Sequence, residues 1–219
     1  MNKEKLLLEL TKKRQATRLD RYNNIGDYHD GIYECDYVSP YSKSAHNVDA
    51  EVMIILQDWS SDKSLSGPIC MDSVTFGHTF LLPTNRYLKE LLKEHCGLEL
   101  EDIYGTNLFP FIKTGNMSAH IPTKDLKLAA LEFALPQIDI ISPRIVICLG
   151  LATFNALRLA TNLKPLKTLS EAIPSPFQYH SSTIYCQAHT GQLGRNNRNR
   201  GGVDRVNKDW KVMYNGMNI

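Results

Sequence analysis

The sequence predicts one α/β domain, with a central parallel β-sheet and helices on both of its faces. Apolar segments of strand length alternate along the chain with segments of helical periodicity, which is typical of parallel strands joined by right-handed crossovers. The chain has 219 residues, of which 42% are hydrophobic and 22% charged, as in one globular domain with a full core. We therefore assign residues 1–219 to one domain, with a helical and irregular N-terminal extension at about residues 1–50.

The N-terminal extension is predicted to begin with a helix and to continue irregularly. Residues 3–21 carry Leu6, Leu7 and Leu10 at helical spacing, opposite a basic face. We interpret that face as a solvated helix surface, with DNA contact as the alternative. Residues 22–50 are rich in Tyr, Asp, Asn, Ser and Gly, which favours turns and leaves room for one short strand around 32–35.

The core is predicted to begin with the strand Val52-Met53-Ile54-Ile55-Leu56. This run is apolar without alternation, as in a strand buried on both faces. Residues 57–83 then form a long loop, and loops of this length inside a compact domain are usually functional. A helix follows that is capped by Thr84 or Asn85 and ends at Gly97, since Thr and Asn cap helices and Gly ends them.

The rest of the chain repeats the alternation of strands and helices. Strands are predicted at residues 103–109, 145–149 and 183–187, and helices at residues 123–141 and directly after Gly150. In open α/β sheets the functional site lies beyond the carboxyl ends of the strands. The residues that follow the strands are therefore the candidates for chemistry.

The composition argues against several classes of protein. The formal charge of +2 is too small to indicate a nucleic-acid partner by itself. The five cysteines are scattered without a CxxC pair, which indicates reduced thiols and argues against zinc or an iron–sulfur cluster, so we expect no metal and no cofactor. No segment has the length of a membrane span or the pattern of a signal peptide, so we expect a soluble, cytoplasmic protein that does not bind membranes.

Polar side chains stand at the ends of three predicted strands. Asp58 follows the first strand, Asn107 stands with Thr106 at the end of the second, and His189 follows the last. Each signal is weak alone, because Asp and Asn often make turn hydrogen bonds and a lone His is more often structural. Their shared placement is stronger, because a carboxylate, an amide and an imidazole in one crevice can hold a base and break its bond to a sugar.

The motifs around these residues resemble those of the uracil-DNA glycosylase superfamily. Leu56-Gln57-Asp58 is similar to the family's GQDPYH motif, and residues 189–193 are similar to HPSPL, with the His and the Leu kept. Tyr104-Gly105-Thr106-Asn107 resembles the family's YITN strand, and residues 143–152 resemble its strand-turn-helix with a Leu-Gly pair. The likeness covers roughly residues 52–195. It implies a three-layer sandwich with a four-stranded parallel sheet, DNA as the partner, a monomer, and a hydrolase that removes a base.

The resemblance also implies a role for each matched residue. Asp58 would orient water and stabilise the positively charged sugar, while His189 would donate to the base oxygen as negative charge builds there. Asn107 would contact the edge of the flipped base, and Phe76 would stack on that base. Leu193 would fill the gap that the flipped base leaves in the duplex.

The residues beside Asp58 bear on the choice of base. Gln57 and Trp59 flank Asp58, and both are predicted to contact the base. Trp59-Ser60-Ser61 replaces the Pro-Tyr-His of the family motif, in which the aromatic residue blocks the methyl group of thymine. Trp59 either blocks that methyl or shapes a different pocket, so the predicted substrate is uracil or a modified pyrimidine.

Arginines follow the predicted wedge residue. Arg195, Arg198 and Arg200 are interleaved with asparagines, and both residue types suit contacts to DNA phosphates. A disordered polar loop is the alternative interpretation. The position directly after His189 and Leu193 favours DNA binding.

The sequence thus predicts a monofunctional DNA glycosylase that flips out a base, hydrolyses its N-glycosidic bond and leaves an abasic site. One alternative is a glycosylase that acts on modified bases of foreign phage DNA as a defence. Another is a non-catalytic DNA-binding module on the same fold, against which the retained Asp58 and His189 argue.

Lyase chemistry through a lysine is not expected, because no lysine lies within the three motifs. A nucleotide-binding fold is remote, because the chain lacks both glycine-rich phosphate motifs.

Overall fold

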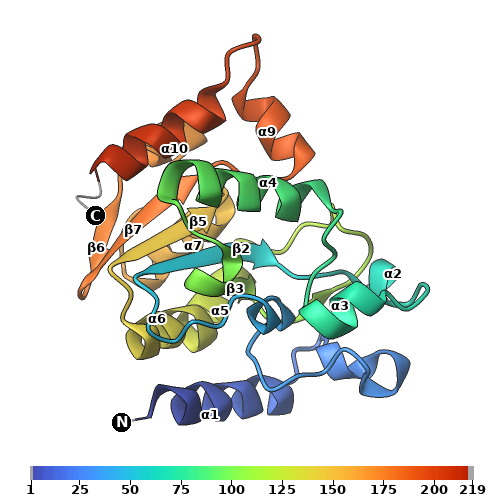
Figure 1. The fold of residues 1–219 in the computed structure, drawn as a ribbon. Helices are drawn as coiled ribbons and strands as arrows, with labels where there is room; N and C mark the ends of the chain where they lie inside the picture. Colours follow the sequence, from blue (N-terminus) through green and yellow to red (C-terminus); the bar gives the residue numbers. More distant parts are fainter. Residues whose placement is uncertain (1, 217–219) are drawn as a thin grey trace.

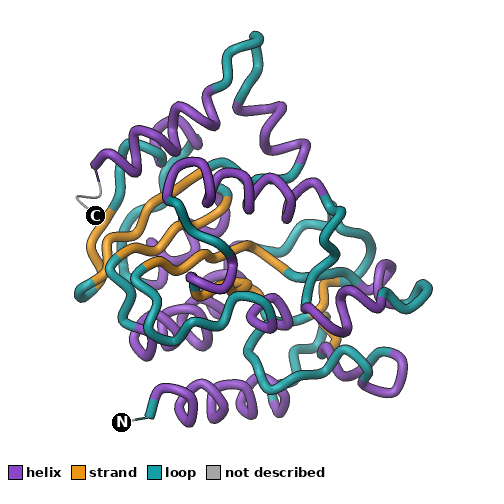
Figure 2. The backbone as a smooth tube through the Cα atoms, in the orientation of Figure 1, coloured by secondary structure: helices purple, strands orange, loops and turns teal. Residues whose placement is uncertain are grey.

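The structure is a computed structural model that describes residues 2–216. At its centre lies a five-stranded sheet in the order β3-β2-β5-β7-β6 (Figure 1, Figure 2). In chain order the strands are β2 Val52–Asp58, β3 Tyr104–Phe109, β5 Ile145–Leu149, β6 Phe177–Tyr179 and β7 Ser182–Gln187. Strands β3, β2, β5 and β7 are parallel, and β6 runs antiparallel to β7 at the edge.

The predicted fold class is confirmed, with one correction to the number of strands. The four predicted strands are all present, and β6 raises the number in the sheet from four to five. β6 has only three residues, too few to show a strand pattern in the sequence. It pairs with β7 through a tight turn in which His180 has a φ of 51°. β2 runs two residues further than predicted, so Asp58 is the last residue of that strand.

Helices cover both faces of the sheet (Figure 1). Those of one face are α5 Thr123–Ala129, α6 Leu135–Ile141 and α7 Leu151–Ala160. Those of the other face are α4 Pro83–Leu91 and α10 Arg205–Gly216. Met53 and Ile55 of β2 point to the first group, whereas Ile54 and Leu56 point to the second. This two-sided burial is the reason why the strand is apolar at every position from 52 to 56.

The predicted helices form, with ends that differ by a few residues. The helix at 123–141 is confirmed as α5, the π-helical turn η6 Ala130–Ala134 and α6 in succession. α4 continues into the π-helical turn η4 Leu92–Cys96 and ends at Gly97, whose φ is 67°, as predicted. It begins at Pro83 with Leu82 as the cap, not at Thr84 or Asn85, because the fixed φ of proline suits the first helical turn.

Other parts of the chain differ from the prediction. α1 spans Lys3–Ala16 and so ends before residue 21, and no strand forms at 32–35. The loop at 57–83 contains the two short helices α2 and α3. The Arg-rich segment around residues 195–200 forms most of helix α9, and the segment that follows it forms helix α10. These and the remaining short elements are α2 Asp62–Leu65, α3 Met71–Phe76, α8 Leu169–Ala172, α9 Gln192–Arg198, η1 Ile25–Asp27, η2 His29–Gly31, η3 Pro40–Lys43 and η5 Leu100–Asp102.

A second, two-stranded sheet joins the N-terminal extension to the core. β1 Tyr22–Asn23 pairs antiparallel with β4 Ile112–Lys113, and Tyr22 lies opposite Lys113. The ring of Tyr22 packs edge-on against Phe109, the last residue of β3, at 4.7 Å between centroids. The extension is therefore part of the framework around the end of β3.

Residues 2–216 contain neither a membrane-spanning helix nor a cluster of metal-ligating side chains. In that part of the chain, no helix is both long and apolar enough to cross a membrane. Over the same residues, no three His, Cys, Asp or Glu side chains gather in a way that could hold a metal ion. The five cysteines are all free thiols.

Candidate active site

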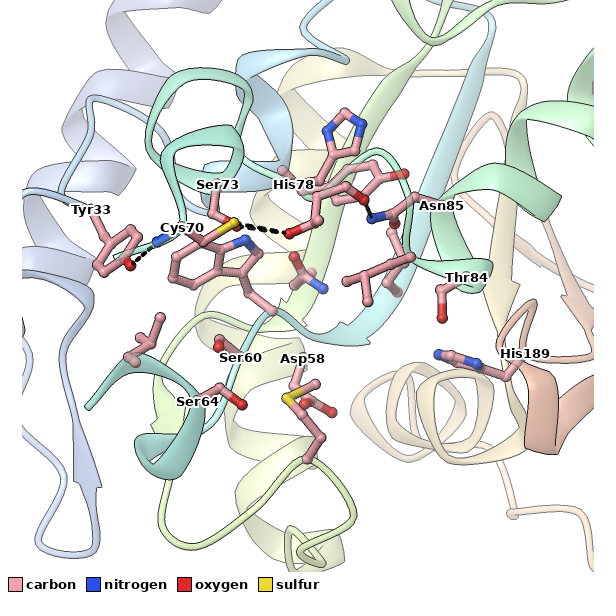
Figure 3. Close-up of a pocket in the computed structure, with 18 residues that line it drawn as sticks. Tyr33, Asp58, Ser60, Ser64, Cys70, Ser73, His78, Thr84, Asn85 and His189 are labelled. Atoms are coloured by element: carbon pink, nitrogen blue, oxygen red, sulfur yellow. Dashed lines mark hydrogen bonds between the residues drawn. The ribbon is translucent and has the colours of Figure 1, made fainter. Parts of the chain in front are cut away.

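A cavity of about 290 Å³ opens at the carboxyl ends of the parallel strands (Figure 3). Asp58 at the end of β2, Asn107 in β3 and His189 after β7 all line it. The remaining wall comes from segment 33–41, the loop with α2 and α3, and the start of α4. The three side chains that were chosen from strand ends therefore meet at one cavity.

Asp58 is held by contacts to both of its carboxylate oxygens. Gln57 Nε2 donates to Oδ1 at 2.9 Å, and the ammonium Nζ of Lys113 lies 2.7 Å from Oδ2. The Asp58 side chain is 7% exposed and that of Lys113 is 4% exposed. Gln57 is thus a support for Asp58, and it is not among the residues that line the cavity.

Lys113 is the residue at this site that the sequence analysis missed. It lies outside the three motifs, and β4 carries it to the outer side of Asp58. Its Nζ also donates to the carbonyl oxygen of Met117 at 2.5 Å. One signal was present in the sequence: Lys113 ends the apolar run Phe109-Pro110-Phe111-Ile112, where a charged residue indicates burial with a partner.

Asn107 is buried, and a serine from the N-terminal extension fixes its amide. The Ser39 hydroxyl donates to Asn107 Oδ1 at 2.6 Å, while Ser39 Oγ accepts from the backbone N–H of Tyr41 at 3.3 Å. Ser39 is fully buried and Asn107 is 1% exposed. With its oxygen engaged by a donor, the amide presents its NH₂ group as a donor to the cavity.

His189 is held as a neutral imidazole. The backbone N–H of Gly191 donates to Nδ1 at 2.9 Å, so in the neutral ring the hydrogen resides on Nε2. Burial lowers the pKa of His189 from its ordinary value of 6.5; the Asp58 carboxylate opposes this effect, and the charge of Lys113 reinforces it. At neutral pH the site therefore contains an uncharged ring with a hydrogen-bond donor at Nε2.

Close packing against His189 requires glycines in the loop that carries it. A Cβ on Gly194 would lie 2.3 Å from the carbonyl oxygen of His189, and a Cβ on Gly191 would lie 2.9 Å from Nδ1. The loop is also tied to α4, because the hydroxyl of Thr190 donates to the carbonyl oxygen of Thr84 at 2.9 Å. These contacts fix the position of the imidazole from two sides.

The aromatic wall differs from the one expected. The rings that line the cavity are Tyr33, Tyr41, Trp59 and His78. Phe76 does not line it: its ring is 42% exposed and packs against Phe80 at 4.7 Å between centroids. α3 ends directly after Phe76, at Gly77 with a φ of 74°, and this turn leaves the phenyl ring outside the cavity.

Trp59 does line the cavity, in a fixed orientation. Its indole N–H donates to the carbonyl oxygen of Gly77 at 2.7 Å, and its ring packs edge-on against Tyr33 at 5.8 Å between centroids. A Cβ on Gly77 would lie 1.7 Å from the carbonyl oxygen of Pro40, so only glycine fits at that position. Trp59 is therefore an immobilised wall of the pocket.

Small polar side chains form another part of the cavity wall, and Ser60, Ser64, Cys70 and Ser73 among them are labelled in Figure 3. They are Ser60, Ser64, Cys70, Ser73 and Thr79. The thiol of Cys70 lies 3.3 Å from Thr79 Oγ1, and the Ser73 hydroxyl lies 3.2 Å from the same atom. Hydrogen bonds from Ser73 and Thr79 lower the pKa of Cys70. This side of the cavity offers several hydrogen-bonding groups to a ligand.

The predicted DNA-contact residues lie on or beside α9. They differ in how exposed their side chains are and in whether those side chains contact other residues. Leu193 is 75% exposed, and Arg200 is exposed as well. The guanidinium of Arg195 lies over the ring of Tyr87, 3.6 Å from its centroid. Arg198 is bound to Asp209 of α10, with Nε 2.6 Å from Oδ2, so its first role is to join α9 to α10.

Comparison with known proteins gives one family. The family model described as Uracil DNA glycosylase superfamily matches residues 45–211, a range that contains Asp58, Asn107, Lys113 and His189. A search of curated protein sequences gives no match. Ser39 and strand β1 lie outside the matched range, although both contact the site.

Proposed function

This chain belongs to the uracil-DNA glycosylase superfamily, and from that premise we propose that it is a monofunctional DNA glycosylase. It would flip a base out of DNA into the cavity, hydrolyse the N-glycosidic bond and leave an abasic site. The observation that carries the proposal is the meeting of a buried carboxylate, an oriented amide and a neutral imidazole at one cavity.

The proposed chemistry follows from where charge develops. As the bond between C1′ and the base nitrogen breaks, its electron pair goes to the base and positive charge builds on the sugar. The Asp58 carboxylate would stabilise that cationic sugar and orient the attacking water, whose oxygen bonds to C1′ as the water loses a proton and the leaving base anion takes one up. His189 Nε2–H and the NH₂ of Asn107 would donate to the oxygens of the leaving base, on which negative charge builds. Fixed donors of this kind need no reorganisation during the reaction.

Contacts to DNA would come from α9 and its surroundings. Leu193 is exposed at the start of α9, directly after the loop of His189, and would fill the gap left by the flipped base. Arg195 and Arg200 would contact phosphates, while Arg198 stabilises the helix through Asp209. DNA binding by this surface would be sensitive to salt.

Uracil is the first candidate base, and a modified pyrimidine is the second. The polar wall of Ser60, Ser64, Cys70, Ser73 and Thr79 supports the second candidate, since it could bind a polar substituent on the ring. With an unmodified uracil in the cavity, those polar side chains would form hydrogen bonds to water instead of to the base. A substrate panel distinguishes the two candidates.

The test is release of a base from labelled oligonucleotides. Single- and double-stranded DNA with one uracil is incubated with the protein, and abasic sites are then cleaved with alkali. Strand breaks are expected to fall about 100-fold or more in Asp58→Asn, and to persist in Asp49→Asn, a control at an 83% exposed carboxylate.

The negative result is equally informative. If uracil is not released, the panel continues with thymine mismatches, 5-hydroxymethyluracil and modified cytosines. A folded protein that binds DNA and releases none of these bases would contradict the proposed activity and support the non-catalytic binding module.

A further inference from the structure

Lys113 is a buried lysine that lies beside the proposed catalytic acid Asp58. The family resemblance assigns this lysine no role. We propose that Lys113 is a positioning residue of this site, whose ammonium group holds the Asp58 carboxylate in a fixed orientation and offsets the charge of that carboxylate near His189. The inference rests on the proposed function for its catalytic consequence, and on the ion pair of 2.7 Å for its physical basis.

The backbone around Lys113 holds its side chain in place. β4 pairs with β1, where Tyr22 lies opposite Lys113, and an isolated parallel bridge joins Lys113 to Ser61, three residues after Asp58. The ammonium group has two protein oxygens as partners, Asp58 Oδ2 and the carbonyl oxygen of Met117. A lysine that is 4% exposed and held in this way has little freedom to leave Asp58.

The carboxylate gains its orientation from this arrangement. The Asp58 side chain is 7% exposed, and a buried carboxylate is costly without a positive partner. Lys113 holds Oδ2 and Gln57 Nε2 holds Oδ1, so rotation of the carboxylate plane is restricted. An oriented carboxylate is what the stabilisation of a cationic sugar requires.

Lys113 also acts on His189 through its charge. The Asp58 carboxylate favours protonation of the ring, whereas Lys113 opposes it. The pair as a whole is neutral, so the imidazole can remain uncharged beside an ionised acid. The other ionisable side chains of the cavity wall are Tyr33, Tyr41, Cys70 and His78. On the β1 side, the hydroxyl of Tyr22 donates to Asp125 at 2.7 Å.

The same geometry argues against Lys113 as a nucleophile. A lysine attacks carbon only as the neutral amine with a free electron pair, and here the amine is paired as an ammonium ion with a carboxylate. Lys113 is also absent from the residues that line the cavity, whereas Asp58 is among them. Lys113 therefore lies behind the acid and would act through it.

Two variants and one control test the proposal. Lys113→Met removes the charge, and Lys113→Arg keeps it. The control is Lys93→Met, because Lys93 also forms an ion pair at 2.7 Å, with Glu99, but on the surface. Single-turnover base release is measured against pH, and the titration of the His189 ring is followed by NMR. Binding to DNA with a stable abasic-site analogue and the melting temperature report on folding.

The expected result is specific to the charge. Lys113→Met should lose about 100-fold or more in rate, and the acidic limb of its profile, which reports on His189, should move to higher pH. The His189 ring should titrate at higher pH than in the wild type. Lys113→Arg should keep both profiles close to wild type, and Lys93→Met should change neither.

Three outcomes would overturn the proposal. One is Lys113→Met with a lower rate but unchanged pH limb and unchanged His189 titration, which indicates a purely structural role. Another is a covalent product between the wild-type protein and abasic DNA after cyanoborohydride reduction that is lost in Lys113→Met, which indicates a nucleophile. The third applies if Lys113→Met does not fold. In that case a Lys113→Arg protein whose pH profile of base release differs from wild type contradicts the proposal, and an unchanged profile supports it.

The proposed function can fail separately from this inference. If the wild type releases no base from any oligonucleotide, the glycosylase proposal fails, yet the NMR titration still tests the electrostatic role of Lys113. An unchanged His189 titration in a folded Lys113→Met protein then overturns the inference by itself.

Discussion

The hydroxyl of Ser39 donates a hydrogen bond of 2.6 Å to the side-chain oxygen of Asn107, across 68 positions of the sequence. This bond determines which end of the amide faces the cavity. A serine in the N-terminal extension, outside the range matched by the family model, thus sets the donor pattern of a proposed base-binding residue.

Ser39→Ala is therefore expected to slow base release by about 10-fold, since one neutral hydrogen bond contributes roughly 0.5–1.5 kcal/mol. Without the serine, the Asn107 amide can turn its oxygen toward the base. Ser42→Ala is a matched control, because the Ser42 hydroxyl is also buried and donates to β3, at the carbonyl oxygen of Gly105. Single-turnover rates and melting temperatures are compared. Equal losses of rate in both variants would show that Ser39 acts only through stability.

The pH dependence of base release should report on His189. Its pKa is lowered by burial from 6.5, so the neutral form persists below pH 6.5 and is lost only as the pH falls through the lower, folded-state value. Activity should accordingly remain at pH 6.5 and decline at lower pH. The same sign applies to stability: below pH 6.5 the unfolded chain binds a proton that the folded chain excludes, so the free energy of unfolding falls.

His189→Ala is the matching variant for this prediction. It should reduce the rate by about 100- to 1000-fold, as expected for one donor at a developing negative charge. His180→Ala, at a ring that is 69% exposed, is the control for loss of a histidine. The profile of base release is recorded from pH 4.5 to 8.5, about two units on either side of the ordinary pKa of histidine. A wild-type rate that halves near pH 6.5 or above would contradict a lowered pKa.

The sequence predicted the part of the site that depends on strand ends. Asp58, Asn107 and His189 could be placed together because the carboxyl ends of parallel strands share one edge of the sheet, and each strand was apolar enough to recognise. Cavity geometry now agrees with that placement. The edge strand β6 could not be predicted in the same way, because three residues carry no detectable periodicity.

The supports of those residues could not be predicted, for a physical reason. Lys113 and Ser39 reach the site through irregular segments, namely a two-residue strand and a 3-10 turn, which have no sequence pattern of their own. Phe76, which was expected to stack on the base, does not line the cavity, for a related reason. The left-handed turn at Gly77 determines the direction of its side chain. Only the folded backbone contains that information.

Leu193→Ala should affect duplex DNA more than single-stranded DNA. A wedge is needed to fill the gap in a base stack, and a single strand has no paired stack to hold open. We expect a loss of about 10-fold on duplex substrate and little change on the single strand. Val212→Ala is the control, since Val212 is a 64% exposed apolar residue on α10. Equal losses on both substrates would contradict a wedge role.

Gly194→Ala tests whether the position of His189 depends on its loop. The added methyl would lie 2.3 Å from the carbonyl oxygen of His189 and 2.9 Å from its Cβ, distances that neither atom can accept without a shift. Displacement of the ring should lower base release about 100-fold, because an error of about 1 Å in a catalytic group has that effect. The melting temperature should fall as well, since an overpacked site typically loses about 1–3 kcal/mol.

Gly216→Ala is the control for this change, because a Cβ at Gly216 meets no atom within 4 Å. The NMR signal of the His189 ring gives a direct measure of displacement, separate from catalysis. A Gly194→Ala protein with an unshifted His189 signal and a wild-type rate would show that the loop accommodates the methyl. In that case close packing at Gly194 would not be what holds the imidazole at the cavity.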